Sequence, residues 1–509
     1  MSFDKTKISI KEAKIILKST YNLEGEITSL NGEIDFNFKI ISNKSKKYLL
    51  KVSRPNYEQE YIDYQIDLLE YLNKSSKIEV PKIINTINNK KSSNFQDING
   101  ENRSVRLMSW IEGRLWSSTN PIKKSLRYEL GFLSSQLAKS MKDFNHPYAH
   151  RTIKWDISKS LWVENHLDTF DSKKAQVLKK FIQDFKNNLL LYKKLEKSVI
   201  HNDINDNNII VTHDFLNPEV KSIIDFGDSV YSQTINDLAI TCSYGIMNHN
   251  DPLLGCIDIV KGYNENRKIK DEELKLLYNL IAMRLVISVT ISSINRNKEP
   301  NNKYLFVSEK SAWNLIYKWS EVNSEFAYYS FRKACSIDAH PNKKKLINWA
   351  KKTNFSIKDL LPEINKSKFY NLDLSVGSKW LGNKSEIEDL DVFQFKIDQL
   401  QKKVPDFIIS GGYLEPRSIY TSNSYEKNGE NGEENRTIHL GLDFWVPPGT
   451  KVSSIFDGEI IAAFNDKGNK EYGGLVIIKH KIDDFEFFSL YGHNTVAVSY
   501  THLTLPTKA

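Results

Sequence analysis

The stretch SVIHNDINDNNIIV, residues 198–211, carries the pattern His-x-Asp-x4-Asn directly after a short apolar strand. A second short strand, in SIIDFGDS, ends at Asp225. Phosphoryl transfer needs one carboxylate that orients the acceptor hydroxyl and takes its proton. It also needs an Asn and a second carboxylate to hold the Mg²⁺ that bridges the phosphates. The spacing therefore predicts a kinase site in which Asp203 is the base, Asn208 and Asp225 bind Mg²⁺, and His201 supports the loop.

The upstream sequence predicts the nucleotide site of a two-lobed kinase. Lys51 ends a strand in KYLLKVS, where it can reach the phosphates, and an acid on the following helix would position it. Glu60 is the expected partner and Glu58 is the alternative. The segment NGEIDFN, residues 31–37, is the expected turn over the phosphates.

The segment RLMSWIEG, residues 106–113, is predicted to join the two lobes. In this position Ser109 and Trp110 would offer backbone groups to the adenine.

Two other interpretations of the motif segments fail on their own patterns. The run Asp203–Asn207 starts like a calcium loop, but Asn208 stands where the loop needs Gly, and Phe215 stands where it needs Glu. A protein kinase is not expected either. DFG occurs at 225–227, but the chain has no G-x-G-x-x-G loop and no APE segment.

With these motifs in place, residues 1–350 resemble the aminoglycoside phosphotransferase family, also called the phosphotransferase enzyme family, in its hydroxylysine-kinase-like branch. The supporting segments are GEIDFNFK, YLLKVS, VRLMSWIEG, HPYAHRTIKWD, IHNDINDNNIIV, IIDFGDS and INDLAI. The resemblance implies an α+β, two-lobed protein-kinase-like fold, with a small antiparallel β N-lobe (1–108) and a mainly helical C-lobe (109–350). It implies that Mg-ATP is the donor and that a hydroxy amino acid or amino alcohol is the acceptor.

The same resemblance implies further roles for single residues. Asp237 would brace the loop that carries Asp225. Asn202 departs from the family, which usually has Gly at this place. Acidic groups in the acceptor pocket would bind an amine, and Arg would bind a carboxylate. The residues expected near this pocket are His150, Arg151, Trp155, Asp156 and Arg284.

Residues 351–434 contain Gly/Ser/Asn-rich stretches, and we expect them to form a connector that ends in an exposed, flexible loop. The β-rich segment that follows (435–496) carries the run His439-Leu-Gly-Leu-Asp443. A turn at Gly441 could bring both side chains to one Zn²⁺, but a hydrolytic Zn²⁺ needs three protein ligands. The segment resembles the β core of lysostaphin-like zinc endopeptidases. That resemblance implies that His439 and Asp443 are zinc ligands and that His493 is a catalytic-side histidine. The family's closing HxH is missing, so we expect an incomplete domain with weak or no zinc binding.

The last residues, 497–509, bear no relation to what precedes them. Residues 498–503 back-translate to a transposon sequencing adapter, so we expect the authentic sequence to stop near Val496. The arrangement also resembles the front of a larger fusion with a class III aminotransferase-like domain. Pyridoxal phosphate is expected only in that missing domain.

Composition argues against a nucleic-acid-binding, secreted or membrane protein. The formal charge is +8, but the basic residues are spread along the chain, so nucleic acid is not an expected partner. The three cysteines form no CxxC pair, the N-terminus has no apolar signal segment, and the longest apolar run (280–294) contains Arg284. We therefore expect a cytoplasmic small-molecule kinase with no membrane partner and make no prediction of its oligomeric state. A zinc metallopeptidase-like protein and a non-catalytic scaffold are the alternatives.

Overall fold

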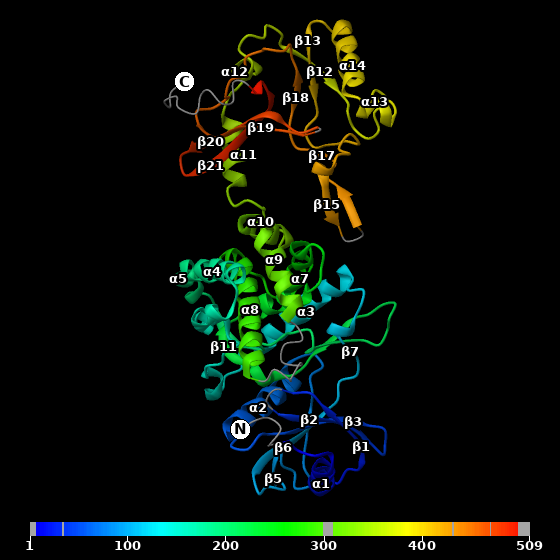
Figure 1. The fold of residues 1–509 in the computed structure, drawn as a ribbon, viewed down its shortest axis with the longest axis vertical. Helices are drawn as coiled ribbons and strands as arrows, with labels where there is room; N and C mark the ends of the chain where they lie inside the picture. The colour runs from blue at the N-terminus through cyan, green and yellow to red at the C-terminus, as the bar shows by residue number, and fades with distance from the viewer. Residues whose placement is uncertain (1–6, 33–34, 299–308, 430–431, 469, 497–509) are drawn as a thin grey trace. The chain divides into compact units, whose positions relative to one another are not determined.

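The computed structural model describes residues 7–32, 35–298, 309–429, 432–468 and 470–496. The chain forms two compact units, Met1–Ala339 and His340–Ala509 (Figure 1). The first unit contains every residue predicted for the kinase site. The boundary falls at 339/340, whereas the sequence placed the end of the kinase lobe at residue 350.

An antiparallel sheet forms the N-terminal lobe of the first unit, in the order β1-β2-β3-β6-β4, with β5 also paired to β6. Strand β2 alternates strictly between buried and partly exposed residues, as expected for a strand with one face on a core. Helix α1 packs its apolar residues, such as Ile16 and Leu17, into that core. The strands are β1 (Gly25–Leu30), β2 (Phe36–Ser42), β3 (Lys47–Val52), β4 (Ile83–Ile84), β5 (Ser93–Gln96) and β6 (Asn102–Ser109); the helices are α1 (Ile10–Tyr21) and α2 (Gln59–Ser75).

Helices dominate the second lobe of this unit. They are α3 (Lys124–Met141), α4 (Ser172–Asn187), α5 (Leu189–Lys193), α6 (Ile235–Gly245), α7 (Pro252–Asn266), α8 (Asp271–Lys298), α9 (Glu309–Glu321) and α10 (Ser324–Ala334). Short strands frame the predicted catalytic segments: β7 (Arg114–Leu115), β8 (Lys197–Ile200), β9 (Ile209–Val211), β10 (Val220–Ile223) and β11 (Val230–Gln233). Strand β9 lies between β10 and β7, and β8 pairs with β11. This two-lobed architecture confirms the predicted fold class.

Helix α8 is the core helix of the helical lobe. Among the described residues it is the one helix long and apolar enough to cross a membrane, and 89% of its most apolar window is buried in the protein. Leu277, Ile281 and Leu285 are fully buried there. Packing within the lobe therefore accounts for its apolar composition.

The second unit combines helices with several small sheets. Residues 351–434, predicted as a connector, form part of a folded layer: β12 pairs in parallel with β13, which pairs with β18. Leu372, Leu374, Ile397 and Ile409 build its core. The loop predicted to be exposed and flexible contains the hairpin β15–β16. Apolar residues spaced along 372–409 give this stretch a core of its own, which the Gly/Ser/Asn-rich composition concealed.

The helices and strands described between residues 438 and 494 are all strands, in agreement with the predicted β-rich character of this segment. Strand β20 is central in the sheet β19-β20-β21. The elements of the second unit are α11 (Lys343–Lys352), α12 (Ile357–Leu360), β12 (Lys368–Leu372), α13 (Lys384–Glu388), α14 (Leu390–Lys403), β13 (Phe407–Gly411), β14 (Glu415–Pro416), β15 (Glu426–Gly429), β16 (Gly432–Asn435), β17 (Ile438–His439), β18 (Asp443–Trp445), β19 (Glu459–Asp466), β20 (Gly473–Ile482) and β21 (Phe485–Asn494). The predicted end of the authentic sequence at Val496 is followed by residues 497–509, which lie outside the described residues.

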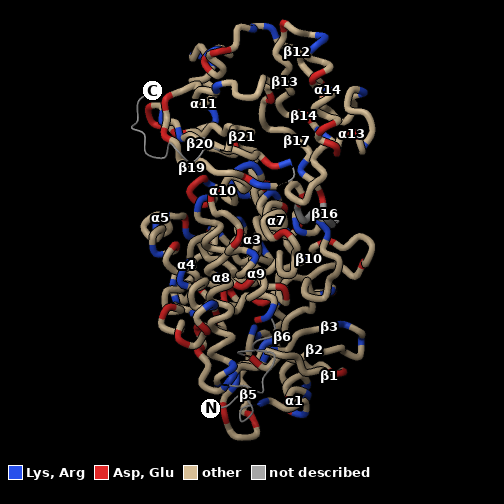
Figure 2. Tube along the Cα trace, turned by 45° about the horizontal axis from the view of Figure 1, so that its top comes forward, with Lys and Arg blue, Asp and Glu red and all other residues tan. Residues whose placement is uncertain are grey.

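Charged residues of both signs are interspersed along the chain in both units (Figure 2). Charges of both signs spread along both units are in keeping with an ordinary solvated surface.

Candidate active site

The loop between β8 and β9 holds Asp203 in a fixed orientation. Its Oδ1 accepts a hydrogen bond from Arg284 Nη2 at 2.7 Å. Its Oδ2 accepts from Asn205 Nδ2 at 2.9 Å and from Asn208 Nδ2 at 2.8 Å. Burial raises the pKa of Asp203 to about 8, although the positive charge of Arg284 opposes this rise. The structure thus brings together Asp203 and Asn208, as the motif spacing predicted.

Asp237, at the start of α6, supports the backbone of this loop. Its Oδ2 and Oδ1 accept from the amides of His201 and Asn202 at 2.9 and 2.8 Å. The resemblance implied that Asp237 braces the loop of Asp225, and this is corrected: its carboxylate binds the loop of Asp203. The first turn of α6 brings the carboxylate to the end of β8, because β8 pairs with β11 directly before this helix.

His201 bridges the two motif loops. Its Nε2 lies 3.0 Å from the carbonyl oxygen of Ile224, and its Nδ1 accepts from the amide of Asp203 at 3.2 Å. Burial lowers the pKa of His201 to about 4, so the imidazole is neutral and donates at one nitrogen while accepting at the other. This geometry agrees with the supporting role proposed for His201.

Asp225 follows β10 and has a left-handed backbone, with φ of 62°. Lys51 Nζ, from β3, donates to its Oδ1 at 3.0 Å, and this charge lowers the pKa of Asp225. The expected pair between Lys51 and Glu60 is not present among the described residues, because Glu60 is exposed in the first turn of α2. The alternative, Glu58, accepts instead from the Tyr148 hydroxyl.

Arg151 connects α2 to the loop of Asp225. Its Nη2 donates to the carbonyl oxygens of Gly227 and Ser229, at 2.5 and 3.1 Å. Three tyrosine rings surround its guanidinium, with centroids 4.9 to 5.5 Å away: Tyr61, Tyr64 and Tyr148. Arg151 therefore hydrogen-bonds the backbone of this loop, and the acceptor contact that the resemblance implied for it stays a prediction.

Asp228 is a site carboxylate that the sequence reasoning missed. It belongs to the run DFGD and lies half-buried beside Asp225, and burial together with that charge raises its pKa. The sequence could have indicated this residue, because a second acid stands three residues after Asp225.

The other residues predicted for the acceptor pocket differ in how far their side chains are exposed. Asp156 is buried and caps the 3-10 helix η4 (Ile157–Thr169) while accepting from Ser232 Oγ at 2.7 Å. Trp155 stacks on the Arg284 guanidinium at 4.5 Å. His150 is exposed and contacts the Tyr231 ring at 4.7 Å. Of these three, His150 alone presents an exposed side chain.

The segment between the lobes already uses two of its amides. The amide of Ser109 donates to the carbonyl oxygen of Lys82 at 2.8 Å, and that of Trp110 to Lys47 at 3.3 Å. The adenine contacts predicted at Ser109 and Trp110 would have to use other backbone groups of this segment.

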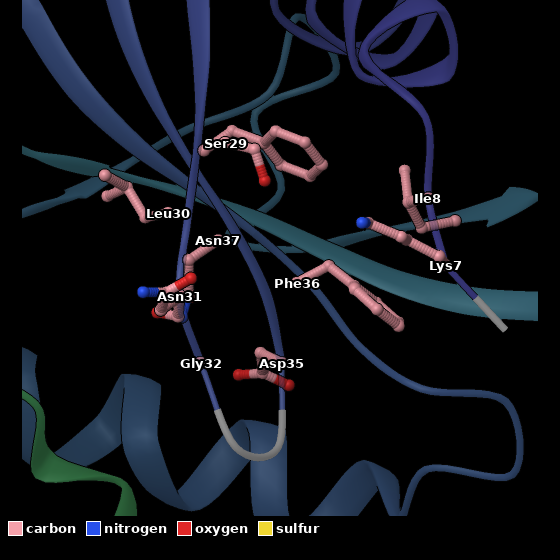
Figure 3. Close-up of a pocket in the computed structure, with 10 residues that line it drawn as sticks. Lys7, Ile8, Ser29, Leu30, Asn31, Gly32, Asp35, Phe36 and Asn37 are labelled. Atoms are coloured by element: carbon pink, nitrogen blue, oxygen red, sulfur yellow. The ribbon is translucent and has the colours of Figure 1, made fainter. Parts of the chain in front are cut away.

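A small cavity of about 110 Å³ lies at the turn between β1 and β2, between residues Ser29–Gly32 and Asp35–Phe38 (Figure 3). Asp35 is buried at this turn and accepts from Arg106 Nη2 at 2.7 Å. Arg106 also binds Gln65 of α2 at 2.8 Å. The turn predicted over the phosphates is thereby anchored to the sheet and to α2 through the side chains of its described residues.

The residues described in the second unit do not fit a catalytic zinc ion. His439 Nε2 lies 3.4 Å from Asp443 Oδ1, so the structure brings this predicted pair together. Arg417 Nη1 is 2.8 Å from the other carboxylate oxygen of Asp443. No described contact joins His493 to either residue, and no three His, Cys, Asp or Glu side chains of the described chain are grouped to hold a metal.

Comparisons with known proteins find a family match for each of the two parts of the chain. Residues 26–255 match the model of the phosphotransferase enzyme family, and residues 437–502 match that of peptidase family M23. The hydroxylysine kinase of Mus musculus is 22% identical over 332 residues, covering 59% of this chain and 86% of that protein. The hydroxylysine kinase of Bos taurus is 24% identical over 334 residues, covering 61% and 88%.

Two solved structures have similar chains. Amicoumacin kinase hAmiN has a TM-score of 0.49 and 16% identity, covering 63% of this chain and 98% of that chain. A microcompartment-associated aminopropanol kinase has a TM-score of 0.47 and 17% identity, covering 64% and 99%. The family matches and the curated relatives confirm the resemblance to the phosphotransferase enzyme family and the resemblance of the β-rich segment to a peptidase family. They also confirm that the chain is an enzyme of the small-molecule phosphotransferase kind.

Proposed function

We propose that this chain transfers the γ-phosphoryl group of Mg-ATP to the hydroxyl of a small hydroxylated amine, a hydroxy amino acid or amino alcohol of the hydroxylysine type. The observation that carries the proposal is the orientation of Asp203, which three side chains fix beside Asn208. The similarity to hydroxylysine kinases supports this class of acceptor.

Asp203 acts as the base in this proposal. Its Oδ1 carries one hydrogen bond in the structure, so a lone pair is available to the acceptor hydroxyl. As the hydroxyl oxygen bonds to the γ-phosphorus, its proton passes to Asp203, and the bond from that phosphorus to the bridging oxygen breaks to release ADP. The raised pKa of Asp203 favours acceptance of the proton.

Asn208 and Asp225 would hold Mg²⁺, which neutralises the charge on the phosphates. The amide nitrogen of Asn208 is used by Asp203, while its oxygen has no hydrogen-bond partner among the described residues. The Asp225 side chain is 45% exposed. Mg²⁺ prefers such oxygens and is usually bound by one or two carboxylates together with substrate phosphates, so the residues fit the ion.

Free thiols support a reducing compartment, and we place the protein in the cytoplasm on that ground. The three cysteines are free and buried: Cys242, Cys256 and Cys335.

Phosphoryl transfer from Mg-ATP to hydroxylysine, ethanolamine, choline, homoserine and an aminoglycoside tests the proposal. We expect turnover of one hydroxylated amine and a fall in kcat of at least about 100-fold in Asp203→Asn, because a positioned base contributes about 10² to 10⁴ in rate. Full turnover by Asp203→Asn would exclude Asp203 as the base. Absence of turnover with every acceptor, despite nucleotide binding, would count against this acceptor class.

A further inference from the structure

We infer that Arg284 is a positioning residue for phosphoryl transfer, which holds the catalytic carboxylate and its loop from helix α8 and does not bind the acceptor. The inference rests on the proposed function. It replaces the earlier expectation that this guanidinium lies in the acceptor pocket to bind a carboxylate.

The contacts of Arg284 all lead to the catalytic loop and its surroundings. Nη2 donates to Asp203 Oδ1 at 2.7 Å. Nη1 lies 3.3 Å from the carbonyl oxygen of Asn202 and 3.2 Å from that of Trp155. One guanidinium thus fixes the carboxylate of Asp203 and the backbone directly before it. Such a planar, forked donor suits two acceptors at set positions, which a lysine would satisfy less well.

The surroundings of Arg284 exclude an incoming ligand. Its side chain is fully buried, and the Trp155 and Tyr244 rings lie 4.5 and 5.4 Å from the guanidinium carbon. A substrate carboxylate would have to displace Asp203 or one of these rings to reach it. The guanidinium therefore balances the charge of the buried Asp203 carboxylate, because a buried cation is stable where it is paired and hydrogen-bonded.

Arg284 completes a clamp on the loop from two helices. Asp237 of α6 accepts the amides of His201 and Asn202, and Arg284 of α8 donates to the acceptors of Asn202 and Asp203. The backbone amides of this short segment are thus bound by a negative side chain on one helix, and its oxygen acceptors by a positive side chain on another. Misplacing a reacting group by about 1 Å can cost about 100-fold in rate, so this clamp would matter for kcat.

The test compares Arg284→Met and Arg284→Lys in the full chain, with the acceptor that the wild type turns over. We expect kcat to fall about 100-fold in Arg284→Met and less in Arg284→Lys, with KM for ATP and for the acceptor changed less than about threefold. A residue that binds the acceptor would instead raise the KM of the acceptor. A rise of that kind, or an unchanged kcat in folded Arg284→Met, would overturn the inference.

Arg127→Met is the matched control. Arg127 is an equally buried arginine of the same lobe, and its Nε and Nη2 bind Asp258 at 3.1 and 3.0 Å. This variant also loses a buried arginine–aspartate pair, so it should lose stability and keep kcat. A similar fall in kcat in both variants would reduce the effect of Arg284 to general destabilisation and overturn its positioning role.

A double-mutant cycle separates the inference from the proposed function. If Arg284 acts through Asp203, adding Arg284→Met to Asp203→Asn should lower kcat by less than about threefold further. A further fall of about 100-fold would show independent action and overturn the inference. Turnover by the wild type tests the proposed function alone. If Arg284→Met does not fold, the same comparison is made with Arg284→Lys and with the double mutant that contains it.

Discussion

The backbone of Asn202 explains why a residue that tolerates a positive φ stands at this place in the loop. Its φ is 64°, in the left-handed region that Gly adopts freely and Asn tolerates better than most residues. The side chain is fully buried, and neither its Oδ1 nor its Nδ2 has a hydrogen-bond partner among the described residues. The conformation, and not the side chain, is what this position requires.

A pair of variants tests this interpretation of Asn202. Asn202→Gly and Asn202→Ala both remove the buried amide, but only Ala places a Cβ on a backbone with positive φ. We expect Asn202→Gly to be more stable than Asn202→Ala by about 1 kcal/mol, measured by urea unfolding. Equal free energies of unfolding for the two variants would contradict the conformational argument.

Asp237 gives a pH dependence with a definite sign. Burial raises its pKa to about 6 in the folded protein, against 3.8 for the ordinary group, and the two amide hydrogen bonds offset part of this rise. The folded state therefore binds the proton more tightly than the unfolded state. Its contribution to the free energy of unfolding is full below pH 3.8 and is lost as the pH rises through 6.

Asp237→Asn lacks this titration, so the comparison isolates it. Relative to the wild type, the variant should gain about 2 kcal/mol in free energy of unfolding as the pH rises from about 4 to 7. Urea unfolding of both proteins across this range measures the difference. A constant difference between the two proteins would mean that Asp237 does not titrate in this window.

At this scale, the sequence indicates which residues come together where a motif fixes both residue type and spacing. The loop that leads into β9 and the loop that follows β10 lie close together, because these two strands are paired. They carry the motif residues His201, Asp203, Asn208 and Asp225. The partners of Lys51 and of Arg284 could not be read from spacing, because they depend on how helices α2 and α8 pack onto those loops. Helix α8 contributes Arg284 from far along the chain, with no local signal to indicate its contact with Asp203.

Among the elements, helices α3 and α7 pack unusually closely. A Cβ at Gly131 would clash with the carbonyl oxygen of Ile259, and one at Gly262 would clash with that of Tyr128. Both obstacles are backbone atoms, which cannot move aside as a side chain can. The two glycines therefore let the helix backbones approach in a way no other residue would permit.

We expect Gly131→Ala and Gly262→Ala each to lower the free energy of unfolding by about 2 kcal/mol or more, since overpacking exceeds the gain in helix propensity. Gly255→Ala in α7 is the control, because its Cβ would meet side-chain atoms of Ile246 and His249. That variant should lie within about 1 kcal/mol of the wild type. Losses of equal size in all three variants, measured by urea unfolding, would contradict the backbone argument.

The elements themselves were largely predictable where apolar periodicity is strong. The alternating strand of residues 36–42 and the apolar core helix of residues 271–298 have clear patterns. The layer built from residues 368–411 was not predicted, because its few apolar residues are separated by polar turns. Parallel pairing of β12 with β13 joins segments that are distant in sequence, and such pairing leaves no local pattern.

For the whole molecule, the described residues place the cores in separate units. The two clusters of the first unit lie within residues 8–335, and the cluster of the second unit lies within residues 372–445. No core residue is shared between them. We therefore expect two thermal transitions in calorimetry of the full chain, one for each unit.

Mg-ATP should stabilise only one of these transitions, because every residue of the proposed kinase site belongs to the first unit. At 100 times its dissociation constant, a ligand that binds only the folded state adds about 2.7 kcal/mol to that unit's free energy of unfolding. Gly131→Ala assigns the transition independently, since it should lower the same transition that Mg-ATP raises. If Mg-ATP and Gly131→Ala acted on different transitions, or if one transition shifted as a whole, the units would not be energetically separate. Zn²⁺ should leave the second transition unchanged, because Arg417 already pairs with the Asp443 carboxylate and the described residues group no three side chains that could hold a metal. A rise of that transition with Zn²⁺ would show that the His439–Asp443 pair opens to accept a metal.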